Sequence, residues 1–241
     1  MMARLIRGLA LSLVLAAATM AHAELLLDAD FESEPVDQEI GLGGAGLGQP
    51  ASLTPTLTAI VRAGIMPSRS LEIAWDDGSG PSVSTLRFEF LDDIEVNNGE
   101  LVIEFEVQPE IVSGYIIGLR ENGSATRIFG EILLLGNGMI RAGDLSTIVT
   151  PLTYGAGELL NVRWVHDMSA RTHSLWIKDT EIFAARPHAY MDRGVGSILF
   201  SLFANSADET KLHIDNVKVT WTPDVLFQDR FESDDIQLDS P

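Results

Sequence analysis

The sequence predicts an all-β protein, built as a two-sheet antiparallel β-sandwich. Apolar and polar residues alternate along most of the chain, and an apolar helical period is almost absent, as expected for strands with one buried and one solvated face. Turn sequences separate the alternating stretches, which indicate about ten to twelve strands. The clearest of these stretches are residues 56–62, 70–75, 83–91, 100–108, 115–120, 127–135, 159–167, 172–178, 196–204 and 212–221.

The strand expected at residues 100–108 shows the alternation most plainly. Leu101, Ile103, Phe105 and Val107 share one side, while the alternate positions are mostly glutamates. Successive side chains of a strand point to opposite faces of its sheet. This strand therefore has one face in the core and one in water.

Turn residues that tolerate a positive φ punctuate the strands. The best hairpin is predicted at Gly136-Asn137-Gly138, which lies between the apolar stretches 132–135 and 139–142. No full-length repeat and no interdomain linker interrupts the pattern. One domain over residues 24–222 is expected, followed by an acidic tail at residues 223–241.

The last strong strand changes its apolar phase. Leu212 and Ile214 occupy even positions, whereas Val217 and Val219 occupy odd ones, so the phase slips at Asp215-Asn216. A β-bulge at this point would return both apolar pairs to the core and would re-aim the Asp215 side chain.

The first residues have the features of a secretory signal peptide. Arg4 and Arg7 precede a small and apolar run at residues 9–18, and Ala21-His22-Ala23 fits the small-x-small cleavage rule. The apolar run is shorter than the roughly twenty residues that span a bilayer. We expect residues 1–23 to direct export to the periplasm or the extracellular space, and we expect no membrane span.

The net charge of the chain limits the classes of partner that it can bind. The formal net charge is −19, and it becomes −21 without the first 23 residues because these hold two arginines and no acids. Such a charge disfavours nucleic acid and anionic membranes, whereas neutral glycans and divalent cations remain suitable. The chain has no cysteine, so its stability must come from the core without disulfides.

Three segments carry a resemblance to known domains. Residues 160–167 and 172–179 resemble the paired strands of laminin-G-like and concanavalin A-like domains, in which a strand with a central Trp and a terminal Asp precedes one that ends in a tight turn. Residues 212–219 resemble the closing strand of the same jelly rolls. The resemblance implies a concanavalin A-like jelly roll, a fold that hosts lectins, glycan-binding modules, glycosidases, lyases and adhesion domains.

The resemblance also implies a structural calcium ion. In jelly-roll carbohydrate-binding modules, an Asp like Asp215 joins oxygens of an N-terminal Phe-Glu strand around the metal. The matching positions are Asp30, Glu32 and Asp215, with Asp28 as a further candidate. Calcium takes six to eight oxygen ligands, so carbonyl oxygens would complete the set. The alternative is that Asp215 caps amides at the bulge and that Asp30 and Glu32 are solvated.

A catalytic reading rests on three glutamates. Family 16 glycoside hydrolases share this sandwich and carry Glu-x-Asp-x-Glu on one strand. Glu100 and Glu104 match the outer positions and Glu106 extends the row, but Val102 replaces the central acid. Because a retaining glycosidase needs two tuned carboxyls, a solvated row of glutamates is the simpler interpretation. Without cysteine or a Gly-x-Ser-x-Gly motif, acyl transfer has no visible nucleophile.

Sugar binding requires an exposed aromatic ring. Trp75, Trp164 and Trp221 share the apolar phase of their strands, so we expect them in the core, whereas Trp176 takes the outward phase. Further candidates are Tyr154, which is expected on a glycine-bearing loop, and Tyr190.

The histidines of the mature chain show no zinc spacing, and we expect most of them at the surface or at sheet edges: they are His166, His173, His188 and His213. The sequence as a whole favours an exported, non-catalytic recognition module for a polysaccharide or cell-surface glycan. The alternatives are a structural or adhesive protein without glycan specificity, and a glycoside hydrolase that uses the glutamate row.

Overall fold

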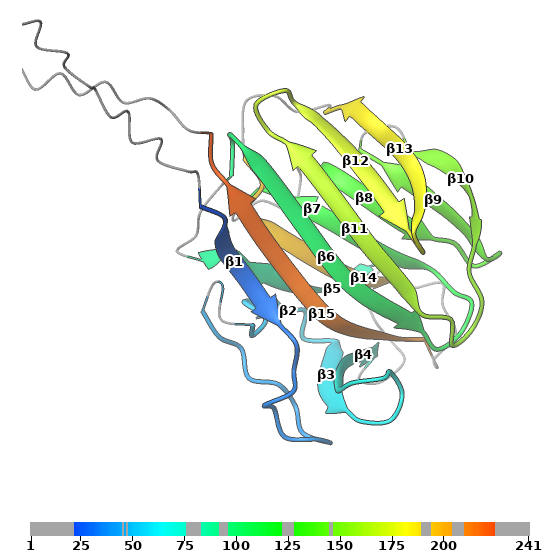
Figure 1. Cartoon of the computed structure of the whole chain (residues 1–241). Coiled ribbons are helices and arrows are strands. Elements are labelled where there is room, and N and C mark those ends of the chain that lie inside the picture. The colour runs from blue at the N-terminus through cyan, green and yellow to red at the C-terminus, as the bar shows by residue number, and fades with distance from the viewer. Residues whose placement is uncertain are drawn as a thin grey trace, which may run out of the picture.

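The computed structural model describes residues 22–44, 46, 48–75, 83–91, 96–121, 128–144, 147–188, 194–203 and 210–224. The predicted fold class is confirmed, since two antiparallel sheets lie face to face (Figure 1). None of the described residues belongs to a helix long and apolar enough to cross a membrane. Most of the signal segment, Tyr190 and nearly all of the acidic tail lie outside the described residues.

Each sheet follows one path of hydrogen-bonded neighbours. Sheet A has the order β13 (Thr180–Pro187), β12 (Thr172–Ile177), β11 (Leu160–Asp167), β6 (Glu100–Pro109), β15 (Lys211–Thr222), β4 (Ser70–Trp75) and β3 (Leu57–Arg62), and β1 (Glu24–Ala29) also pairs with β15. Sheet B has the order β10 (Ile148–Thr153), β9 (Met139–Gly143), β8 (Ile128–Leu134), β7 (Tyr115–Arg120), β14 (Ser197–Phe203), β5 (Val83–Glu89) and β2 (Ser52–Leu53).

The core lies between the sheets. The predicted inward side of β6 is fully buried, and Phe105 meets Phe200 of β14 edge to face, with ring centroids 5.5 Å apart. Trp164 of β11 is fully buried over Gly130 of β8. The aromatic side chains therefore join the two layers, as close-packed interiors require. Trp75 and Trp221 pack against this core but are only partly buried.

The predicted bulge in β15 is confirmed. The register between β15 and β6 shifts between Asp215 and Lys218, and Asn216 takes a left-handed φ of 52°. Asn is one of the few non-glycine residues that adopt this conformation readily. As a result, the apolar residues on both sides of the bulge are buried in the same core.

The two ends of the described chain meet along β15. Leu25 of β1 pairs with Thr220, and Ala29 pairs with Val217, so the first and last described strands form an antiparallel pair. The hairpin at residues 136–138 is also confirmed, since Gly138 has a φ of 78° and its N–H donates to the Leu135 carbonyl at 2.9 Å.

The described residues form fifteen strands rather than ten to twelve. Several of the extra strands are short or lie at sheet edges, and β10 and β13 each end one side of their sheet. Most side chains of β13 are exposed or half-buried on both faces. Apolar alternation is absent there because an edge strand has little to bury.

Candidate functional site

The outer face of sheet A carries a row of paired polar and aromatic side chains. The register places Lys218 opposite Glu104, Glu104 opposite Arg163, and Arg163 opposite Trp176. Directly opposed residues of neighbouring strands point to the same face. The four side chains from β15, β6, β11 and β12 therefore form one line across the sheet, which we call the outer row.

Contacts hold the outer row together. Arg163 Nε lies 3.4 Å from Glu104 Oε1, and the guanidinium carbon of Arg163 lies 5.3 Å from the Trp176 ring centroid. A cation over an indole face at this distance is attracted by the ring quadrupole. Trp176 is partly exposed, which agrees with its predicted outward phase.

The outer row borders a groove of about 400 Å³. Besides the row itself, Glu106, Asn161, Asp179 and Asn216 supply carboxylate and amide groups to its walls. Asn216 reaches the groove because the bulge turns it outward, and its Nδ2 donates to Glu106 Oε2 at 3.0 Å. The groove thus combines one aromatic ring with hydrogen-bonding groups of both polarities.

The glutamate row is only partly gathered in this groove. Glu104 and Glu106 line it, but Glu100 does not. Glu100 lies at the far end of β6, opposite Asp167 and Thr222. Glu100 and Glu104, the two positions that match family 16 glycosidases, therefore do not meet at the groove. Catalysis by these glutamates remains a prediction.

Tyr154 is not the exposed aromatic residue that the sequence predicted for sugar binding. Its ring is buried, and its hydroxyl accepts the Ser113 N–H at 3.1 Å and faces the carbonyl oxygens of Ser113 and Leu135. Burial raises the Tyr154 pKa to about 12. The tyrosine therefore ties a loop to the β8–β9 hairpin and is not available for stacking on a sugar. Tyr190 lies outside the described residues.

The four residues expected to bind calcium differ in burial and in their hydrogen-bond partners. Asp28, Asp30 and Glu32 are exposed, whereas Asp215 is buried. Asp30 Oδ1 accepts the Glu32 N–H at 3.1 Å, and Glu32 Oε1 accepts the Arg69 N–H at 2.9 Å. Within the described part of the chain, they are not among the groups with ligand atoms within 4.8 Å of one another. Calcium binding by these residues remains a prediction.

Asp215 has its own partners at the bulge. Its carboxylate accepts from the Ser68 hydroxyl and from the Asn216 N–H at 2.7 Å. Burial raises the Asp215 pKa to about 6, and the nearby carboxylates of Glu106 and Glu32 act in the same direction. These contacts match the alternative reading, in which Asp215 caps backbone groups at the bulge.

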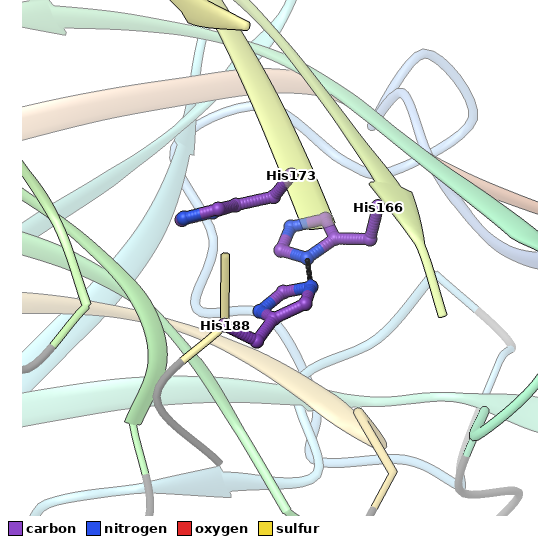
Figure 2. Close-up of side chains that lie close together, drawn as sticks. All are labelled: His166, His173 and His188. Atoms are coloured by element: carbon purple, nitrogen blue, oxygen red, sulfur yellow. Dashed lines mark hydrogen bonds between the residues drawn. The ribbon is translucent and has the colours of Figure 1, made fainter. Parts of the chain in front are cut away.

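The histidine prediction is wrong, because all four histidines are buried. His166 shares the inward phase of Trp164, and His173 shares that of Leu175, so the alternation of β11 and β12 already held the signal. With His188, which follows β13, these two form a buried cluster (Figure 2). His213 belongs to a second cluster with Glu72 and Glu110.

The three imidazole rings of this cluster pack against one another, with the His166 and His173 centroids 5.4 Å apart and both rings next to His188. His188 lies 4.9 Å from His166 and 4.7 Å from His173 between ring centroids, with tilts of 17° and 26°. His166 Nδ1 is 3.2 Å from His188 Nε2, and Trp164 Nε1 donates to His173 Nδ1 at 3.1 Å. Burial lowers the pKa of all three, so they are neutral near pH 7.

Comparisons with known proteins bear on the fold. No protein-family model matches the chain, and no curated protein matches its sequence. Among solved structures, a sialidase is similar over 82% of this chain and 18% of its own, with a TM-score of 0.57 and 14% identity. A carbohydrate esterase from Shiga toxin-encoding bacteriophage phi24B is similar over 83% of this chain and all of its own, with a TM-score of 0.53 and 8% identity.

The binding domain of botulinum neurotoxin DC, solved with rat synaptotagmin II, is also similar. It matches over 83% of this chain and 48% of its own, with a TM-score of 0.53 and 11% identity. The chain thus spans less than a fifth of the sialidase and about half of the toxin domain. At such low identity these likenesses speak to the fold alone, and they are consistent with the jelly-roll β-sandwich that the resemblance implied.

Proposed function

We propose that the protein is a non-catalytic glycan-binding module and that its ligand lies in the groove beside the outer row. The proposal rests on the position of Trp176, which lines one groove together with Asn161, Asn216 and the charged side chains of the outer row. Pyranose rings present apolar faces and many hydroxyl groups. A partly exposed indole with donors and acceptors around it suits both features.

The charges of the groove favour a neutral polysaccharide. Arg163 is paired with Glu104, which weakens its attraction for a polyanion, and Lys218 lies opposite the same glutamate across the sheet. The chain as a whole carries a formal charge of −19, which repels acidic polymers at long range. Neutral glycans escape this repulsion and can still bridge the amides and carboxylates.

The fold and the first residues give further support. The sialidase and the carbohydrate esterase among the similar structures are named for activities on carbohydrates. Export fits the signal-like residues 1–23, and polysaccharides of cell surfaces and walls are met outside the cytoplasm. The alternative is a structural or adhesive role, in which the groove has no glycan specificity.

Affinity electrophoresis of residues 24–241 through gels that contain plant or bacterial polysaccharides tests the proposal. We expect retardation by at least one neutral polymer, and we expect Trp176→Ala to weaken it at least tenfold, as for a central aromatic contact. Phe203→Ala is the matched control, because Phe203 is an exposed aromatic residue beside a groove of sheet B.

The outcomes separate the alternatives. Binding that survives Trp176→Ala and is lost with Phe203→Ala would move the site to sheet B. The absence of retardation by any polymer would favour the structural role. Release of reducing sugar that Glu104→Gln abolishes would show that the groove is catalytic. Running each gel with calcium and with EDTA also tests the predicted calcium ion.

A further inference from the structure

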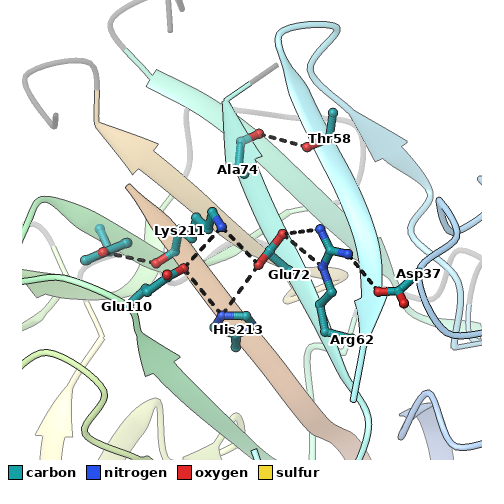
Figure 3. Close-up of polar contacts among 9 residues, drawn as sticks. Asp37, Thr58, Arg62, Glu72, Ala74, Glu110, Lys211 and His213 are labelled. Atoms are coloured by element: carbon teal, nitrogen blue, oxygen red, sulfur yellow. Dashed lines mark hydrogen bonds and ion pairs between the residues drawn. The ribbon is translucent and has the colours of Figure 1, made fainter. Parts of the chain in front are cut away.

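A second polar cluster lies further along β15, away from the groove. β15 runs between β4 and β6, and His213 of β15 is directly opposite Glu72 of β4. Glu110 directly follows β6, and its N–H donates to the Lys211 carbonyl at 3.1 Å. Three segments that are distant in sequence thus bring an imidazole and two carboxylates together (Figure 3).

The three side chains surround a space of the size of a metal ion. His213 Nε2 lies 3.8 Å from Glu72 Oε2 and 3.9 Å from Glu110 Oε2, and the three ligand atoms are all within 4.8 Å of one another. A cation centred among them would be roughly 2.1 to 2.5 Å from each atom, which meets the range of about 2.0 to 2.2 Å for zinc bound to nitrogen and carboxylate oxygen.

His213 is a buried ligand without a hydrogen-bond partner. Its side chain is 1% exposed, and neither ring nitrogen makes a hydrogen bond. A buried polar atom without a partner destabilises the folded state. The unpartnered Nε2 faces the two carboxylates and would be satisfied by a cation.

Glu72 is already oriented for this task. Arg62 donates through Nε and Nη2 to Glu72 Oε1 at 3.2 and 3.0 Å, and Arg62 Nη1 donates to Asp37 at 2.8 Å. The guanidinium therefore holds one carboxylate oxygen and leaves Oε2 directed at His213. Neighbouring groups of this kind commonly fix the ligands of metal sites.

We propose that Glu72, Glu110 and His213 bind a divalent cation of the zinc class, in competition with the ammonium group of Lys211. Lys211 Nζ lies 3.6 Å from Glu72 Oε2 and 3.5 Å from Glu110 Oε2, so it faces the same two oxygens. Its long and partly exposed side chain can swing into water when a divalent cation enters. Nitrogen and carboxylate ligands together suit zinc better than calcium, which prefers oxygen ligands alone.

The three-histidine cluster is the weaker candidate for the same ion. Its nitrogens also lie within 4.8 Å of one another, but the hydrogen bond from Trp164 occupies one of them. His173 Nδ1 accepts from Trp164, which places the proton of the neutral ring on Nε2 and leaves no lone pair for a metal.

Calorimetric titration of the untagged, EDTA-stripped chain with zinc chloride tests the proposal. We expect one equivalent of zinc to bind, and we expect Glu110→Gln to weaken binding at least tenfold. Glu110 is about half exposed, so this variant should fold. Lys211→Met removes the competing charge while keeping the apolar stem, and it should tighten zinc binding several-fold. Glu158→Gln, which also removes an ion-paired and partly exposed carboxylate, should bind zinc as the parent does.

If the cluster were only an ion-pair network, Lys211→Met would not increase the affinity for zinc. Weaker zinc binding by Lys211→Met, or no heat of binding up to millimolar zinc, would overturn the proposal. So would zinc binding that is lost with His188→Gln but retained with Glu110→Gln, because the ion would then belong to the three-histidine cluster.

Discussion

The contact between Gly130 and Trp164 makes a sharp prediction for the core. A Cβ atom at residue 130 would lie 2.1 Å from Cζ2 and 2.3 Å from Cη2 of the Trp164 indole. The indole cannot retreat easily, because it is fully buried and donates a hydrogen bond to His173. Gly130→Ala therefore forces a shift of β8 or β11, which are in different sheets.

The magnitude follows from overpacking. Extra carbon atoms in a well-packed core cost about 1 to 3 kcal/mol, while the entropy gain of a Gly-to-Ala change returns about 0.4 to 1 kcal/mol. For a domain of this size, each kcal/mol lowers the melting temperature by about 2 to 4 °C. We therefore expect Gly130→Ala to melt several degrees below the parent.

Thermal unfolding followed by tryptophan fluorescence and circular dichroism measures the effect. The matched control is Gly136→Ala, because a Cβ at residue 136 meets nothing within 4 Å and needs no positive φ. Its melting temperature should stay equal or rise slightly. If the two variants melt within one degree of each other, the described packing of Trp164 is wrong.

Three further predictions concern the bulge and the buried tyrosine. Asn216→Ala should lower the free energy of unfolding in urea by about 1 kcal/mol, because alanine adopts a left-handed φ less readily than asparagine. Asn216→Gly should lose less, and equal losses for the two variants would contradict this reason. Burial raises the Asp215 pKa to about 6, so the folded protein binds this proton more tightly than the unfolded chain does. The protonated carboxyl therefore stabilises the fold fully below about pH 3.8, and this stabilisation is lost as the pH rises through 6. In EDTA, Asp215→Asn should therefore gain stability relative to the parent between pH 4 and 7, by at most about 3 kcal/mol, and a pH-independent difference would refute the assignment. Tyr154→Phe should lose about 1 to 3 kcal/mol through the unpaired backbone groups and leave glycan retardation unchanged; weaker retardation would restore Tyr154 as a ligand residue.

The features predicted correctly from the sequence are those that depend on residues close together along the chain. The alternation at residues 100–108 predicted β6, and the phase change at Asp215-Asn216 predicted the bulge, because both follow from which side of one strand is buried. The edge strand β13 was missed for the same reason, since a strand with little to bury has no such pattern.

The groove and the cluster of His213 with two glutamates depend on pairing between distant strands. Trp176 was identified by its outward phase, but only the register across β12, β11 and β6 brings it into line with Arg163 and Glu104. His213 takes an outward position on β15 and is buried nevertheless. Residues 63–69 lie over this face, where Gln108 Nε2 donates to the Ile65 carbonyl at 3.5 Å and Ser68 donates to Asp215. A covering loop of this kind leaves no periodic signal in the sequence.

The most direct test of the glycan-binding account is the dissociation constant for an oligosaccharide of the retained polymer, measured calorimetrically for the parent, Trp176→Ala and Phe203→Ala. We predict a loss of at least tenfold in affinity for Trp176→Ala alone, with an unchanged melting temperature. Equal affinities for the parent and Trp176→Ala would contradict the assignment of the outer face of sheet A as the binding surface.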